Sequence, residues 1–154
     1  MKLSTLLKLI RFWPPFLGAG IKVKSFNEDY SMLTVQMKLR FWNKNYVGTH
    51  FGGSLYSMTD PFYMLLLLHA LGKGYIVWDK SASIRYKKPA RNTVFAEFKL
   101  STDLIETIKN QLETAPKTEA EFLIEIKDQE GDVVAEIKKT LHINKKIRQA
   151  NGVD

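Results

Sequence analysis

Hydrophobic and polar residues alternate along six segments of the chain, which is the pattern of half-buried β-strands. The clearest segment is 31–41, where five apolar residues share one face: Leu33, Val35, Met37, Leu39 and Phe41. Similar patterns predict strands at 21–26, 75–87, 93–101, 119–127 and 132–143. In the last segment the residues predicted to face inward are Val133, Ala135, Ile137, Leu141 and Ile143. Short turns between such strands favour an antiparallel sheet.

Apolar residues at helical spacing predict three helices. Residues 1–17 form an amphipathic N-terminal helix that ends at Pro14 and Pro15. Its charges interrupt the apolar run and no clear cleavage site follows, which argues against a signal peptide. A long helix at 55–71 is apolar nearly all round, and a short helix begins near Asp103 with Glu106 as its capping partner.

This order of elements predicts an α+β fold, in which a long central helix is wrapped by an antiparallel sheet of about six strands. We find no repeat or linker, so we expect one domain over 1–154, with a basic tail at 144–154. The uninterrupted apolar run at 64–68 is much shorter than the roughly 20 residues of a membrane span. The N-terminal helix is expected to pack on the domain or line a pocket, in preference to a membrane surface.

The start of the central helix carries the candidate chemistry. Gly52 and Gly53 have no side chains to cover the backbone at the start of this helix. The unpaired N–H groups there could stabilise a developing negative charge on a ligand. Asp60 lies further along this apolar helix, where a carboxylate is costly unless it is paired or solvated. It is predicted either to act as a general base or nucleophile, or to cap a kink at Pro61.

The run Asn45-x-x-Gly48-x-x-Phe51-Gly52-Gly53, followed by Asp60, resembles the hotdog-fold thioesterases of the phenylacetate-pathway type. That family has Asn-x-x-Gly-x-x-His-Gly-Gly and an acid seven residues after the second glycine. A second segment, 83–90, resembles its apolar-x-Tyr/Phe-x-x-Pro-Ala run. The chain departs from the pattern at Phe51, which replaces the histidine, and at Pro61.

The resemblance implies a hotdog fold and hydrolysis of an acyl thioester, with coenzyme A as part of the substrate and no separate cofactor. It implies that Asp60 is base or nucleophile, that the Gly52 N–H polarises the carbonyl, and that Asn45 orients water or substrate. The residues predicted to bind substrate are Gly53, Phe51, His50, Asp79, Lys88 and Arg91.

Several of these residues have a plainer interpretation. Asn45 could close a turn, and Phe51 could pack the loop. His50 stands one position before the family's histidine. Lys88 and Arg91 belong to a basic turn that could be merely solvated instead of contacting CoA phosphates.

The spacing of the catalytic candidates predicts an oligomer. Gly52 and Asp60 are eight residues apart, which is about 12 Å along one continuous helix. Both groups must lie near one reacting carbonyl, so they are expected to come from two chains. We therefore expect a homodimer, or a homotetramer built from dimers.

Composition narrows the remaining alternatives. The 154 residues include no cysteine, which excludes disulfides and fits a reducing compartment, and we expect the cytoplasm. The three histidines lack metal-ligand spacing, so no metal is predicted. The net charge of +7 would suit nucleic acid, but no nucleic-acid motif accompanies it. The main alternative to a thioesterase is a hotdog protein that binds acyl-CoA or fatty acyl groups without turnover; a dehydratase would need a better placed histidine.

Overall fold

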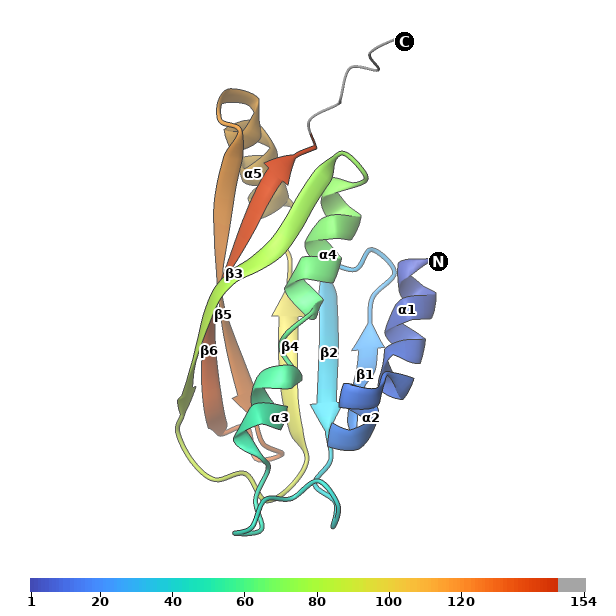
Figure 1. Ribbon diagram of the computed structural model, residues 1–154, viewed down its shortest axis with the longest axis vertical. Helices are drawn as coiled ribbons and strands as arrows, with labels where there is room; N and C mark the ends of the chain where they lie inside the picture. Colours follow the sequence, from blue (N-terminus) through green and yellow to red (C-terminus); the bar gives the residue numbers. More distant parts are fainter. Residues whose placement is uncertain (147–154) are drawn as a thin grey trace, which may run out of the picture.

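Six strands form one antiparallel sheet in the order β1-β2-β4-β5-β6-β3 (Figure 1). The computed structural model describes residues 1–146. The strands are β1 (Ile21–Phe26), β2 (Met32–Met37), β3 (Tyr75–Tyr86), β4 (Val94–Lys99), β5 (Lys117–Lys127) and β6 (Val133–Lys145). All six predicted strands are present, and the predicted α+β fold is confirmed.

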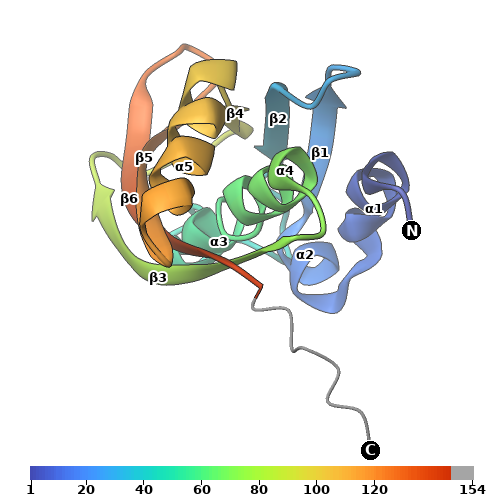
Figure 2. The same cartoon turned by 90° about the horizontal axis from the view of Figure 1, so that it is seen from above.

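The helices lie on the inner side of this curved sheet and at its β1 edge (Figure 2). They are α1 (Leu3–Leu9), the 3-10 turn η1 (Ile10–Phe12), α2 (Pro14–Ala19), α3 (Gly52–Ser57), α4 (Phe62–Leu71) and α5 (Thr102–Thr114). The sheet curves around α4, which contacts β3 and α5. Phe62 on α4 is fully buried and its ring centroid lies 5.1 Å from that of Phe98 on β4, so α4 forms the centre of the core.

The central helix is bent, and the prediction of one continuous helix over 55–71 is wrong in this respect. α3 ends at Ser57, residues 58–61 form a turn, and α4 begins at Phe62. Pro61 precedes α4 as its N-cap residue. Proline has no N–H to donate and disfavours helical geometry in the residue before it, so it explains the break.

The N-terminal helix is present and its inner face packs as predicted, with Leu7 and Ile10 buried. However, Pro14 and Pro15 do more than end a helix. They occupy the first positions of α2, where the missing N–H groups cost nothing. α1, η1 and α2 all contact β1, so this edge of the sheet is covered by helices.

The strand predicted at 31–41 ends at Met37, four residues early. The side chain of Asn43 causes this end, since its Oδ1 accepts from the Arg40 N–H and its Nδ2 donates to the Lys38 carbonyl. Those backbone groups are therefore unavailable for strand pairing. Phe41, predicted to face inward, is exposed.

Two further boundaries differ from the sequence prediction. The side chain of Ser101 caps α5 by accepting from the Leu104 N–H, whereas Asp103, predicted as the cap, lies in the first turn. β6 extends to Lys145, two residues into the predicted tail; residues 147–154 of that tail lie outside the described residues. Within the described part of the chain, no helix combines the length and apolar character needed to cross a membrane.

Candidate active site

A lysine lies at the centre of a charged cluster beside the break in the central helix. Lys139 is an inward-facing residue of β6, and its side chain is 0% exposed. Its Nζ lies 3.2 Å from Asp60 Oδ1 and 3.1 Å from Asp79 Oδ2, and it also donates to the Asp60 backbone carbonyl. A buried ammonium needs such partners because it has lost its hydration. The two acids therefore hold Lys139, and Lys139 fixes the position of Asp60.

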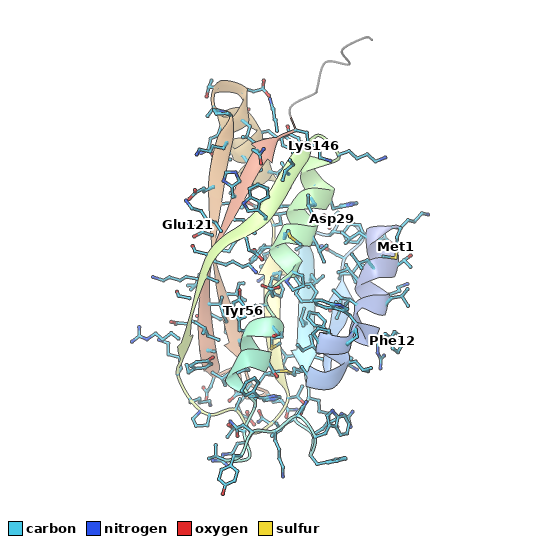
Figure 3. All side chains as sticks on the ribbon, in the orientation of Figure 1. Met1, Phe12, Asp29, Tyr56, Glu121 and Lys146 are labelled. Atoms are coloured by element: carbon cyan, nitrogen blue, oxygen red, sulfur yellow. The ribbon has the colours of Figure 1, made fainter. Side chains whose placement is uncertain are left out.

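Tyr56 on α3 is the fourth member of this cluster, and it is labelled in Figure 3. Its hydroxyl donates to Asp60 Oδ1 at 3.2 Å. Burial raises the pKa of Tyr56 to about 12, and the negative charges of Asp60 and Asp79 add to this effect. Tyr56 therefore remains a hydrogen-bond donor at neutral pH.

Asp79 lies beside an irregularity in β3. The residue paired with Asp79 is Leu141, and the residue paired with Ser81 is Thr140, so Lys80 is an extra residue in this strand. Such a bulge shifts the alternation of side chains by one position. Asp79 is paired with the inward-facing Leu141 and therefore faces the same side as Lys139. Burial raises the pKa of Asp79, while its hydrogen bond to Lys139 lowers it.

Asp60 differs from the sequence expectation of an acid buried on an apolar helix. It lies in the turn between α3 and α4, and its side chain is 42% exposed. Its Oδ1 accepts from both Tyr56 and Lys139. Among the described residues no partner is found for Oδ2, so this oxygen is available to a ligand or a water molecule.

A second group of predicted residues surrounds a pocket of about 350 Å³ at the start of α3. The pocket is lined by Asn45, Thr49, His50, Gly52, Leu55, Tyr86, Lys87, Lys88, Pro89 and Ala90. Gly52 lies under the side chain of Tyr86, because a Cβ at this glycine would be 2.7 Å from the Tyr86 hydroxyl. Asp60 does not line this pocket, so one chain does not bring Gly52 and Asp60 to one pocket.

Asn45 and Gly48 shape the loop that leads into the pocket. Asn45 Oδ1 accepts from the N–H groups of Val47 and Thr49, and Nδ2 donates to Thr49 Oγ1 at 2.8 Å. Gly48 has φ of +79°, a conformation that favours glycine. The Asn-x-x-Gly part of the motif thus has a clear structural role, and the predicted contact of Asn45 with water or substrate stays a prediction.

His50 is buried beneath the loop at 3% exposure. Its Nε2 lies 2.7 Å from the Asn92 carbonyl oxygen, so this nitrogen carries the proton. Burial lowers the pKa of His50, which is therefore neutral at pH 7. Its Nδ1 has no hydrogen-bond partner among the described residues.

The other predicted binding residues differ in how free their side chains are. Phe51 is exposed, and its ring lies so close to Gly53 that a Cβ there would be 2.5 Å from it. Lys88 is paired with Asp128 at 2.7 Å and Asp132 at 2.6 Å, and this pairing raises the pKa of Lys88. The two acids also neutralise the positive charge of Lys88, which was predicted to contact the phosphates of CoA. Arg91 is exposed beside this turn.

The structure thus groups six of the nine predicted residues into two places, and Gly53, Phe51 and Arg91 belong to neither. Asp60 and Asp79 belong to the cluster with Lys139 and Tyr56, which the sequence did not single out. Asn45, His50, Gly52 and Lys88 line the pocket. Over residues 1–146, no three or more His, Asp or Glu side chains are placed to hold a metal ion.

Solved structures of other proteins share this architecture. A Pseudomonas aeruginosa protein of unknown function, described as a probable thioesterase, is 17% identical with a TM-score of 0.84, over 95% of this chain and 97% of that one. A Haemophilus influenzae thioesterase is 15% identical with a TM-score of 0.69, over 98% and 96%. The phenylacetic acid degradation protein PaaI of Thermus thermophilus, in a mutant form, is 21% identical with a TM-score of 0.58, over 84% and 97%.

These likenesses establish the fold, and the protein is a hotdog-fold protein, as the sequence resemblance implied. Its sequence matches a family profile over residues 3–143, and the chain therefore belongs to the family described as "Domain of unknown function (DUF4442)". Among curated proteins, none has a sequence that matches this chain.

Proposed function

We propose that this protein hydrolyses acyl thioesters and that its substrate is an acyl-CoA. The main support is the geometry of Asp60, whose Oδ1 is fixed by Lys139 and Tyr56 while the carboxylate stays partly exposed. A fixed carboxylate with a free oxygen suits a general base. The fold agrees, since similar structures belong to proteins described as thioesterases.

In the proposed reaction, Asp60 removes a proton from water, and the resulting hydroxide adds to the thioester carbonyl. The Gly52 N–H stabilises the oxyanion of the tetrahedral intermediate. The C–S bond then breaks, the proton passes to the departing thiolate, and the products are a carboxylic acid and free CoA. Lys139 and Asp79 act as positioning residues for Asp60.

We infer that the active form is a homodimer, in which Asp60 of one chain serves the Gly52 pocket of the other. β3 is an edge strand of the sheet, and residues 78–83 along it are all exposed. An open edge of this length is a ready surface for pairing with another strand. Because Asp79 lies on β3, the charged cluster borders this edge.

The first test measures thiol release from acyl-CoA substrates of several chain lengths. Asp60→Asn removes the base and keeps the shape, so we expect kcat to fall by at least about 100-fold. Asp103→Asn, an exposed acid of α5, is the matched control and should retain full activity. Turnover that survives Asp60→Asn would overturn the proposed role. Saturable acyl-CoA binding without thiol release by the unaltered protein would instead support the non-catalytic alternative.

A second test isolates the Gly52 N–H. Gly52 is the first residue of α3, and Phe51 before it has φ −64° and ψ 131°, which is compatible with a following proline. Gly52→Pro removes the N–H, whereas Gly52→Ala adds a Cβ against Tyr86 and keeps it. We expect Gly52→Pro to lower kcat about 100-fold or more below Gly52→Ala. Equal activity of the two variants would exclude this N–H as the oxyanion donor.

The dimer is tested by mixing Asp60→Asn chains with Gly52→Pro chains. Each variant alone has two defective sites, but a mixed dimer has one site with both native groups. Random exchange should therefore restore about a quarter of the native activity. No recovery, despite exchange shown by mass-tagged chains, would place both groups in one chain.

A further inference from the structure

Large hydrophobic side chains are exposed together near the N-terminus. On η1, α2 and the adjoining end of α1, the exposed residues are Leu9, Phe12, Trp13 and Leu17. Phe41 and Trp42, in the turn after β2, are exposed as well. Phe12 projects away from the sheet (Figure 3). All six side chains are more than half exposed, and together we call them the N-terminal face. Large exposed hydrophobic side chains gathered in one part of a surface are typical of an interaction site.

The two parts of this face are physically joined. The Asn43 side chain donates to the Ala19 carbonyl at the end of α2, at 2.8 Å, which fixes the turn against the helices. A groove of about 380 Å³ runs between them, with Leu17 on the helix side and Trp42 on the turn side. The helices and the turn therefore form one surface.

Basic residues surround this face. Arg11, Lys38 and Arg40 line the groove between the helices and the turn. The Arg11 guanidinium lies 5.2 Å from the ring centroid of Phe12, and that of Arg40 lies 5.2 Å from the ring centroid of Trp42. Each guanidinium is thus held beside an exposed aromatic ring, an arrangement suited to a boundary between acyl chains and charged headgroups.

The charge is concentrated in this part of the chain. Residues 1–51 contain eight basic residues, which are Lys2, Lys8, Arg11, Lys22, Lys24, Lys38, Arg40 and Lys44. They contain two acids, Glu28 and Asp29, so their formal charge is +6 of the +7 of the whole chain. Both acids lie in the turn between β1 and β2, at the ends of these strands remote from the groove.

These observations favour one kind of partner. A second copy of the same face would bring like charges together across a two-fold axis, which opposes association. Nucleic acid would compensate the charge but would leave aliphatic side chains such as Leu9 and Leu17 without apolar contacts. An anionic bilayer satisfies both features, because its phosphates attract the basic residues and its acyl region receives the apolar ones.

We propose that the N-terminal face binds the surface of an anionic lipid bilayer. Phe12, Trp13 and Leu17 enter the boundary between headgroups and acyl chains, and Arg11 and Arg40 contact lipid phosphates. The protein is then a peripheral membrane protein whose helices lie in the plane of the interface. This proposal is independent of the thioesterase reaction, since it rests on a different part of the chain.

The test is flotation of the full chain with vesicles of phosphatidylcholine alone or mixed with phosphatidylserine. We expect binding to the mixed vesicles, weakened by salt, and little binding to the neutral ones. Arg11→Glu with Arg40→Glu, and separately Phe12→Ser with Trp13→Ser, should each lower the partition coefficient at least about tenfold. The controls are Lys127→Glu with Lys138→Glu, and Leu123→Ser, which alter exposed residues of β5 and β6 and should bind normally.

Thermal melting of every variant verifies its folding before the flotation result is compared. Three outcomes would overturn the proposal. One is no binding to either vesicle. A second is equal loss of binding in the control variants. The third is that Phe12→Ser with Trp13→Ser dissociates an oligomer of the unaltered protein, or abolishes retention on nucleic acid, while vesicle binding is unchanged.

Discussion

The charged cluster and the loop pocket perform their proposed roles with different chemical means. The cluster consists of Asp60, Asp79, Lys139 and Tyr56, and it depends on charged groups that are wholly or partly removed from solvent. The pocket at Gly52 is built from backbone groups and neutral side chains, apart from Lys87 and Lys88, which are both already paired with acids. Buried charges are sensitive to the loss of one partner, whereas neutral hydrogen bonds are lost singly and at modest cost.

This difference shows where the molecule is most vulnerable. In the cluster the cation is fully buried and the anions keep contact with solvent, at 42% exposure for Asp60 and 29% for Asp79. Removing the anions and removing the cation should therefore lower the free energy of unfolding by unequal amounts. The pocket has no such difference between a buried cation and partly exposed anions. The loss of stability in each pocket variant should therefore follow the number of hydrogen bonds that the substitution removes.

The largest effect is expected from Asp60→Asn combined with Asp79→Asn. This pair of changes leaves the Lys139 ammonium buried without a counter-charge. The free energy of unfolding at pH 7 should fall by about 3–5 kcal/mol, measured by urea denaturation. A decrease below about 1 kcal/mol would mean that Lys139 reaches water and that the cluster resembles an exposed ion pair.

Asn45→Ala is expected to have the next largest effect, and it lies on the pocket side of the comparison. It removes the acceptor of the Val47 and Thr49 N–H groups and the bond to Thr49 Oγ1. We expect a loss of about 1–2 kcal/mol in urea denaturation. Asn144→Ala, whose side chain makes one backbone bond within residues 1–146, is the comparison variant and should lose less. Equal losses would show that these loop bonds add nothing to stability.

Lys139→Met is expected to change stability by less than about 1 kcal/mol, since it replaces a buried ion by an apolar chain and leaves two carboxylates that can be hydrated. Activity should respond differently. Because Lys139 is a positioning residue, Lys139→Met should lower kcat about tenfold and leave KM nearly unchanged. Lys138→Met, the neighbouring exposed lysine, is the matched control. A rise in KM at constant kcat would indicate a substrate contact instead.

The smallest effect is a dependence of stability on pH caused by His50. Burial lowers the pKa of His50 in the folded state, so the unfolded chain takes up the proton first as the pH falls. The free energy of unfolding should decline below about pH 6.5, by at most about 1.4 kcal/mol per pH unit. His50→Gln should remove this part of the decline, as seen in urea titrations between pH 7 and 5.5. An unchanged slope would show that His50 titrates normally.

The strands were predictable because alternation depends only on which face is buried. The errors occur where a side chain competes with the regular pattern. Asn43 takes the backbone groups that would extend β2, and Pro61 interrupts a helix that its apolar residues alone would continue. Both residues are visible in the sequence, but the bonds of Asn43 link segments whose proximity only the folded chain creates.

The site was predictable only in part for a similar reason. The motif located Gly52 and Asp60, but Lys139 was missed, because a charged residue in an alternating strand is ordinarily assigned to solvent. Its position midway between the inward-facing Ile137 and Leu141 is the signal that could have revealed it. Tyr56 carried no comparable signal, since it is one of several apolar or aromatic residues near the start of the central helix.

The extra residue in β3 has a consequence for how such proteins are compared. Lys80 is an extra residue, so Asp79 before it and Ala82 after it are both paired with inward-facing residues of β6, Leu141 and Lys139. A chain that lacked residue 80 would keep both pairings and leave Asp79 facing inward. Chains with and without the extra residue would therefore carry the same inward-facing acid at positions that differ by one along β3. Alignments that forbid a gap in this strand would match Asp79 with residues that face the opposite side.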